Sequence, residues 1–267
     1  MKTLFHVQAT QEPVDAQTLL LEIGPDHCSY AFFDRANSSI SALKYFIVNE
    51  FETEASIQSI SEEIKSRSFT EVIICSAFPN ALLTPNVFAR DAGSLVDIIY
   101  DQPMQHYLQD SINEWQLVNA YSLPLNVFEL LINEFPAALF THVYTPALKL
   151  HNGFSEQDQI SIHFTTQYFR VLVKKQGQIE LAQIYSYKTP LDVVYYLLKI
   201  CSELQLDQSI VYLVLSGLVE EASALYKELH HYFLNIYFAQ PPAVTAPENE
   251  YPRHFFSSVY NLAACVS

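Results

Sequence analysis

Several side chains whose types can do chemistry stand next to each other in the sequence. His27-Cys28 could form a nucleophile pair in which the imidazole takes the thiol proton, and His230-His231 could bind a metal ion. Neighbours in a strand point to opposite faces, and neighbours in a helix lie about 100° apart. Neither pair therefore converges on one substrate or one ion, and roles in packing or at the surface are favoured for both.

Longer motifs with a known chemistry are absent from the sequence. It contains no HExxH, no GxSxG, no Walker loop and no GxGxxG. Asp97 and Asp101 could meet one helical turn apart, but two carboxylates repel each other unless a metal is bound, and a loop boundary explains them as well. We predict no catalytic residue and no metal ligand from these patterns.

Composition narrows the class of protein and of ligand. The chain has 267 residues, of which 50% are hydrophobic and 13% aromatic, which excludes a disordered protein and allows one large domain or two small ones. The formal net charge of -15 opposes binding to nucleic acid, which needs clustered Lys and Arg. The 17 Tyr and 18 Phe could instead form a surface that binds another protein.

The cysteines and the apolar runs of the sequence predict where in the cell the protein is found. The four cysteines form no CxxC pair, and the first residues lack the longer apolar core of a signal peptide. We expect a protein of the reducing cytoplasm. No apolar run approaches the roughly 20 residues of a membrane helix, so we expect no membrane.

The first half of the chain shows a regular succession of predicted elements. Three short apolar runs separated by turn residues predict an antiparallel meander, at 19–24, 28–33 and 43–48. Ile57, Ile60 and Ile64 share one face of a predicted helix, and 71–75 is a continuous apolar strand of the kind buried on both faces. Further on, 86–97 and the segment after Ser122 or Pro124 suggest helices, and 115–121 and 138–144 suggest strands.

The second half repeats the order of three strands, a helix and a strand. Strands are predicted at 159–164, 169–173, 181–187 and 210–215, and a helix follows Thr189-Pro190, with Leu191, Val194, Tyr195 and Leu198 as its apolar stripe. Then come a helix over 219–232, a strand over 233–238, a proline-rich loop over 240–252, and an apolar tail over 255–266 that forms a strand or a helix.

Spacing supports an internal duplication. Glu22 lies 54 residues before Ser76 (76 − 22), and His163 lies 53 residues before Ser216 (216 − 163). Two unrelated α/β units of similar size are the alternative. We therefore predict a first lobe over 1–150 and a second lobe over 151–267.

A unit of three strands, a helix and a strand that occurs twice resembles the actin-like ATPase superfamily, to which actin, sugar kinases and the pilus protein PilM belong. The resemblance implies an α/β fold with duplicated ribonuclease H-like units, two lobes and an interlobe cleft that normally binds nucleotide. The whole chain also resembles a domain-of-unknown-function family found mainly in Bacteroidetes, similar to actin-like proteins in fold. The segments that carry this resemblance are Leu20-Leu21-Glu22-Ile23-Gly24, Ser122-Leu123-Pro124, and Phe255 to Ala263 with Val259-Tyr260-Asn261-Leu262.

The same resemblance assigns the residues that would bind a nucleotide. Active members have Asp-x-Gly at the first strand turn, where this chain has Glu22-Ile23-Gly24 followed by Pro25, which lacks a backbone N–H. In the second lobe they have an acid and a Gly-rich loop, where this chain has Ser216-Gly217. With five glycines in the whole chain, close approach of backbone to phosphate is restricted.

The sequence therefore favours a non-catalytic actin-like protein that acts as a scaffold or protein-binding module, without a cofactor. The alternative is a nucleotide-binding enzyme, an ATPase or a kinase-like protein, that uses ATP with magnesium in the interlobe cleft. In it Glu22 and Gly24 would form the phosphate and metal turn, and Ser216 and Gly217 would lie near the nucleoside. A third hypothesis is a sensor that binds a small ligand in that cleft without hydrolysis. The oligomeric state is left open.

Overall fold

The computed structural model describes residues 1–9, 17–150 and 157–266, and these form two compact units. Unit 1 comprises Met1–Asn152, Pro242–Glu250 and Ser258–Ser267, and unit 2 comprises Gly153–Pro241 and Tyr251–Ser257. The lobes predicted as 1–150 and 151–267 differ from this grouping at the carboxyl-terminal end. There, two segments group with the first unit: Thr245 exchanges backbone hydrogen bonds with Ser38 and Ile40, and the last helix buries Val259, Tyr260 and Leu262.

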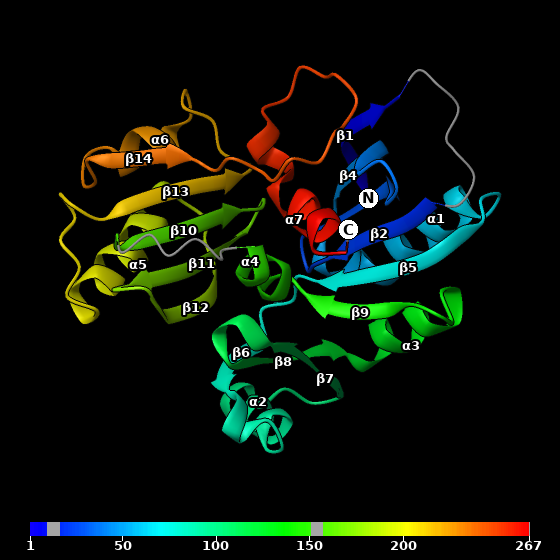
Figure 1. Cartoon of the computed structure of the whole chain (residues 1–267), viewed down its shortest axis with the longest axis horizontal. Coiled ribbons are helices and arrows are strands. Elements are labelled where there is room, and N and C mark those ends of the chain that lie inside the picture. Colours follow the sequence, from blue (N-terminus) through cyan, green and yellow to red (C-terminus); the bar gives the residue numbers. More distant parts are fainter. Residues whose placement is uncertain (10–16, 151–156, 267) are drawn as a thin grey trace. The chain divides into compact units, whose positions relative to one another are not determined.

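Unit 1 is built on a six-stranded sheet with the strand order β1-β4-β3-β2-β5-β9 (Figure 1). Its strands are β1 (Lys2–Gln8), β2 (Gln17–Ile23), β3 (His27–Asp34), β4 (Ser39–Ile47), β5 (Phe69–Ser76) and β9 (Leu139–His142). The three strands β2, β3 and β4 form the predicted antiparallel meander, and β5 runs parallel to β2. All seven residues of β2 are buried, as expected for a central strand covered on both faces.

Helices and a second sheet complete unit 1. Helix α1 (Thr53–Ile64) buries the predicted face of Ile57, Ile60 and Ile64. Between β5 and β9 the chain forms a three-stranded antiparallel sheet, β6-β8-β7, from β6 (Ala81–Pro85), β7 (Gln105–Ile112) and β8 (Leu117–Pro124). The remaining helices of the unit are α2 (Ala92–Tyr100), α3 (Leu125–Glu134), α4 (Tyr144–Leu150) and α7 (Ser257–Cys265).

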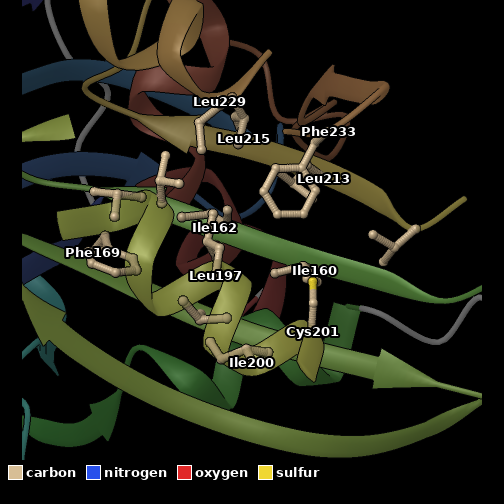
Figure 2. Packing of buried hydrophobic residues seen from close by; sticks show 14 of the residues in the cluster. Ile160, Ile162, Phe169, Leu197, Ile200, Cys201, Leu213, Leu215, Leu229 and Phe233 are labelled. Carbon is tan, nitrogen blue, oxygen red and sulfur yellow. The ribbon is translucent and has the colours of Figure 1, made fainter. Parts of the chain in front are cut away.

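Unit 2 is built on a five-stranded sheet with the strand order β12-β11-β10-β13-β14. Its strands are β10 (Gln159–Phe164), β11 (Tyr168–Lys175), β12 (Gln178–Ser186), β13 (Tyr212–Gly217) and β14 (Asn235–Phe238), and its helices are α5 (Pro190–Glu203) and α6 (Ala224–Leu229). Figure 2 shows the core of this unit, where Ile162, Phe169 and Leu215 of the sheet meet Leu197 of α5 and Leu229 of α6. Burial of these side chains fixes both helices on one face of the sheet.

The central strands of the two units pair in the same way. Glu22 of β2 lies opposite Cys75 of β5, and His163 of β10 lies opposite Ser216 of β13. The partner stands 53 residues further along the chain in both pairs (75 − 22 and 216 − 163). The predicted order of three antiparallel strands, a helix and a parallel strand is thus present in each unit, with Cys75 rather than Ser76 opposite Glu22.

Two helices differ from the sequence prediction. The apolar stripe expected on α5 is half right: Val194 is buried and Leu198 packs against the core, but Leu191 and Tyr195 are exposed. The helix instead also buries Val193, Leu197 and Ile200. Its amino terminus is as predicted: Thr189 and Asp192 form a reciprocal capping box with Pro190 in the first turn. The helix expected over 219–232 is shorter, since Ser223 caps α6 and only 224–229 are helical.

Other elements were either not predicted from the sequence or were predicted in a different form. β1, β6 and β7 were not predicted, since β7 (QHYLQDSI) alternates weakly and β6 spans five residues. The segment over 86–97 divides into a 3-10 turn at 86–88 and α2, and the apolar tail is the helix α7. Within the described ranges, no helix combines the length and the apolar character that crossing a bilayer requires.

Candidate functional site

The turn between β2 and β3 in unit 1 holds a buried charged cluster, which we call the His27 cluster: Glu22, Asp26, His27 and Ser258. His27 Nε2 lies 2.9 Å from Glu22 Oε1, and His27 Nδ1 lies 2.8 Å from Asp26 Oδ1. The three side chains of Glu22, Asp26 and His27 are 3% exposed or less. An imidazole that contacts a carboxylate at each nitrogen donates at both and carries a positive charge.

The pKa of His27 agrees with this geometry. Burial by itself would lower it, but the hydrogen bonds to Asp26 and Glu22 and the charges of both carboxylates outweigh burial and raise the pKa from 6.5 to about 9. His27 is therefore an imidazolium at neutral pH. It supplies the positive charge that lets two carboxylates stay buried in one turn.

Helix α7 contributes the fourth member of the His27 cluster. The Ser258 hydroxyl donates a hydrogen bond to Glu22 Oε2, so both oxygens of that carboxylate have a partner. Ser258 begins the part of the carboxyl-terminal segment that packs with unit 1. The contact therefore joins residues that are 236 positions apart in the sequence.

The backbone of the same turn is also occupied. A Cβ at Gly24 would lie 2.8 Å from His27 Cε1 and 2.9 Å from His27 Nδ1, so the imidazole covers the glycine directly. The Gly24 N–H donates to the His27 carbonyl at 2.9 Å, and Pro25 has no N–H. The first predicted pair, Glu22 and Gly24, thus lies in one turn, with its carboxylate and its amide both bonded within the protein.

The corresponding strand end in unit 2 holds a hydrogen-bonded pair of a histidine and a serine. His163 Nδ1 lies 3.0 Å from Ser216 Oγ, and the Ser216 hydroxyl also lies 3.1 Å from the Ile162 carbonyl. Both side chains are buried. The turn that follows His163 is closed by a bond of 2.9 Å from the Thr165 N–H to the Tyr168 carbonyl.

Gly217 stands where two backbone segments touch. Its φ is +75°, and a Cβ there would lie 2.1 Å from the Phe164 carbonyl oxygen. Only glycine permits this conformation together with this approach. The next amide, that of Leu218, donates to the same Phe164 carbonyl at 2.8 Å. Ser216 and Gly217 are thus neighbours of Phe164 within unit 2, while Glu22 and Gly24 belong to unit 1.

A second buried polar cluster of unit 1 surrounds Asp110 of β7. Its Oδ2 accepts hydrogen bonds from Thr145 Oγ1 at 2.6 Å, Thr141 Oγ1 at 2.8 Å and the His142 N–H at 2.9 Å. Burial raises the pKa of Asp110, and these bonds oppose that effect. The cluster fastens the inserted sheet to β9 and α4, which is a structural role.

The pairs first singled out for chemistry do not form sites. Burial raises the pKa of Cys28 to about 12, and both nitrogens of His27 contact carboxylates, so His27 is no base for that thiol. His230 ends α6, its ring 4.8 Å from that of Tyr226. In the part of the chain that the structure describes, no three His, Cys, Asp or Glu side chains gather as a metal site.

The sequence did not predict the role of His27, although the pattern contained a signal for it. With Gly24 to Asp26 as the turn, the hairpin pairs Ile23 with Cys28 and Glu22 with Ser29. Alternate residues of a strand share a face, so His27 lies on the face of Ser29, beside Glu22. The contribution of Ser258 had no such local signal.

Solved structures of similar shape identify the fold. A Bacteroides thetaiotaomicron protein with actin-like ATPase fold and unknown function is 17% identical, has a TM-score of 0.79, and the match covers 94% of this chain and 96% of that chain. The structure of the PilM-PilN type IV pilus biogenesis complex is 12% identical over 95% of this chain and 99% of that one, with a TM-score of 0.64.

A third similar structure is the ethanolamine utilization protein EutJ from Carboxydothermus hydrogenoformans, which is 8% identical over 96% of this chain and 91% of that chain, with a TM-score of 0.50. At these identities the likeness shows the fold alone, and it confirms the predicted actin-like ATPase fold. Among curated proteins, no sequence matches this chain.

The sequence itself identifies the family. The family model described as "Protein of unknown function (DUF3822)" matches residues 8–236, which is most of the chain. The match includes the β2–β3 turn with Glu22, Gly24 and His27, and the end of β13 with Ser216 and Gly217. The actin-like ATPase fold expected from the sequence is present in the structure. The chain belongs to the DUF3822 family.

Proposed function

We propose that this protein is a non-catalytic member of the actin-like ATPase fold that acts as a scaffold or protein-binding module. The observation that carries the proposal is the His27 cluster. At the turn where active relatives are expected to hold a metal ion and phosphate, an imidazolium of the protein itself lies between the two carboxylates. An internal cation of this kind makes a magnesium ion unnecessary for charge balance.

The backbone of both turns supports the same proposal. A phosphate is bound by free N–H groups that converge on it. In unit 1 the Gly24 N–H is bonded to the His27 carbonyl and Pro25 has none, and in unit 2 the Leu218 N–H is bonded to the Phe164 carbonyl. The glycine at 217 is explained by its contact with Phe164, without a ligand.

A protein as the partner is supported by the kind of surface and by one similar structure. The net charge of -15 opposes nucleic acid. The PilM-PilN structure, of similar fold, is a complex of two proteins. A scaffold binds its partner through its surface and needs no catalytic residues at the strand ends. In such a protein the His27 cluster can act only to stabilise the fold.

Thermal unfolding with and without nucleotide tests the proposal. We expect about millimolar ATP with magnesium to leave the unfolding midpoint within about 1 °C of the apo value, because a ligand that does not bind the folded state cannot stabilise it. A rise of several degrees would overturn the proposal in favour of the nucleotide-binding enzyme. In that case Glu22→Ala should abolish the ATP-dependent shift, whereas Asp97→Ala, at a carboxylate outside the turn, should retain it.

A further inference from the structure

The outer edge of strand β14 in unit 2 is available for hydrogen bonding. β14 ends the five-stranded sheet, and among the described residues no strand pairs with its outer side. The Ala239 N–H donates to the Leu215 carbonyl at 2.8 Å, which fixes which residues of β14 bond to β13. Since alternate residues of a strand bond to opposite sides, the N–H and C=O groups of Ile236 and Phe238 face the open edge.

Apolar side chains gather along this edge. Leu234 is 70% exposed and Tyr237 is 50% exposed, and Ile210, at 60%, stands beside them. Asn235 Nδ2 donates to the Ile210 carbonyl at 3.3 Å, so the starts of β13 and β14 lie together.

The two faces of β14 differ in what they bury. The rings of Tyr212 and Tyr237 are 5.2 Å apart on the face away from α5 and α6. Ile236 and Phe238 on the other face pack against the core but stay partly exposed. A further strand would remove apolar surface from water on both faces of the sheet.

The charge of the side chains near β14 favours one kind of binding partner over another. Two acidic side chains lie near the ends of β14. Asp207 Oδ1 accepts from the Ser209 N–H at 2.8 Å, and the Ser209 carbonyl accepts from Asn235 Nδ2. After burial, the charge of Glu221 helps raise the pKa of Tyr226, whose ring stacks on that of Phe238. A second copy of the chain would bring the same negative charge to the edge and be repelled. A partner segment with basic side chains would be attracted.

We propose that the open edge of β14 binds an extended segment of a partner protein as a sixth strand, and that this segment alternates apolar with basic residues. The proposal rests on the proposed function and deepens it, because it names the surface and the chemistry of the partner. Main-chain hydrogen bonds to Ile236 and Phe238 supply affinity, and contacts with Leu234 and Tyr237 supply selectivity.

Binding of a synthetic probe tests this. The probe is a fluorescein-labelled peptide of ten residues in which Val and Lys alternate, and its fluorescence anisotropy is followed as the full chain is added. We expect saturable binding below about 1 mM, and about tenfold weaker binding when all the peptide nitrogens are methylated, because this removes the N–H groups from both edges of the peptide strand. Equal binding of the methylated probe, or no binding of the first, would overturn the proposal.

Matched variants locate the binding. Ile236→Pro removes an N–H on the open side, where an edge strand tolerates proline, and should weaken binding about tenfold. Tyr237→Thr should weaken it as well, while Tyr195→Thr, at an aromatic residue of α5 that is 62% exposed, should leave it within about twofold. If Tyr195→Thr weakened the probe as much as Tyr237→Thr, binding would be non-specific and the proposal wrong.

Two further outcomes are decisive. A dimer in sedimentation that Ile236→Pro abolishes would make a second copy the occupant and overturn the proposal, and so would equal binding of a probe in which Glu replaces Lys. The nucleotide experiment is separate: stabilisation by ATP refutes the scaffold, whereas failure of the probe without any effect of ATP refutes only the β14 edge.

Discussion

The two strand turns that occupy equivalent places in the two units are stabilised by different physics. In unit 1 the residue at the end of the first strand is Glu22, and an imidazolium, a second carboxylate and a serine surround it. In unit 2 the equivalent residue is His163, which meets Ser216 at 3.0 Å, and Gly217 allows the backbone to touch Phe164. The same topology thus accommodates, at this position, either a carboxylate bound by an imidazolium or a histidine bound to a serine.

Comparison of the two turns shows what the fold requires at the end of the central strand. The His27 side chain fills the space over Gly24 in unit 1, and the Phe164 backbone lies against Gly217 in unit 2. In both turns the nearby amide is bonded to a carbonyl of the protein. In unit 1 the stability depends on charge balance, because buried carboxylates need a cation. In unit 2 it depends on the missing Cβ of one glycine.

The strongest test of this comparison is Gly217→Ala. A Cβ 2.1 Å from the Phe164 carbonyl oxygen, at φ +75°, forces the two backbone segments apart, and we expect the free energy of unfolding to fall by about 5 kcal/mol. Urea unfolding measures the loss. Gly177→Ala is the control, with a similar φ of +76° but nothing within 4 Å, and should cost about 1 kcal/mol. Equal losses would show that backbone strain alone, rather than the contact, matters.

A smaller effect is expected when the charged cluster loses its cation. His27→Ala removes the imidazolium that contacts both buried carboxylates, Glu22 and Asp26, and should lower the free energy of unfolding by about 4 kcal/mol. His163→Ala in unit 2 removes the hydrogen bond with Ser216 and should lower the free energy of unfolding by about 1 to 2 kcal/mol.

A further variant separates charge from packing. Combining His27→Ala with Glu22→Gln and Asp26→Asn neutralises the carboxylates, and part of the stability should return. If the triple variant were as unstable as His27→Ala, the loss would come from the cavity and the charged interpretation would be wrong.

An effect smaller than that of His27→Ala is the dependence of stability on pH that His27 should confer on unit 1. The pKa of His27 is about 9 in the folded protein and 6.5 as its ordinary value, so its contribution is complete below about pH 6.5 and is lost as the pH rises through about 9. We expect the free energy of unfolding to fall by about 3 kcal/mol between pH 7 and pH 10. Denaturant titrations across this range should show a slope that the neutral triple variant lacks, and parallel slopes would contradict the assignment.

Local patterns in the sequence determined the central strands, the helices α1, α3 and α5, and the repeated order of three strands, a helix and a strand in both units. The apolar runs at 19–24 and 159–164 became central strands because burial on both faces requires continuous apolar residues. Thr189, Pro190 and Asp192 predicted the start of α5 because a capping box acts within four residues. Glu22 and Gly24 could also be placed in one turn, because they are only two residues apart in the sequence.

What the sequence could not settle depends on contacts between distant residues. Ser258 reaches Glu22 across 236 positions, and Gly217 is needed only because Phe164 lies against it. The exposed Leu191 and Tyr195 on α5 show that an apolar stripe does not reveal which face the sheet will cover. Periodicity reports the local geometry of a helix or strand, whereas charge balance and steric contact in a turn are decided only when separate segments pack together.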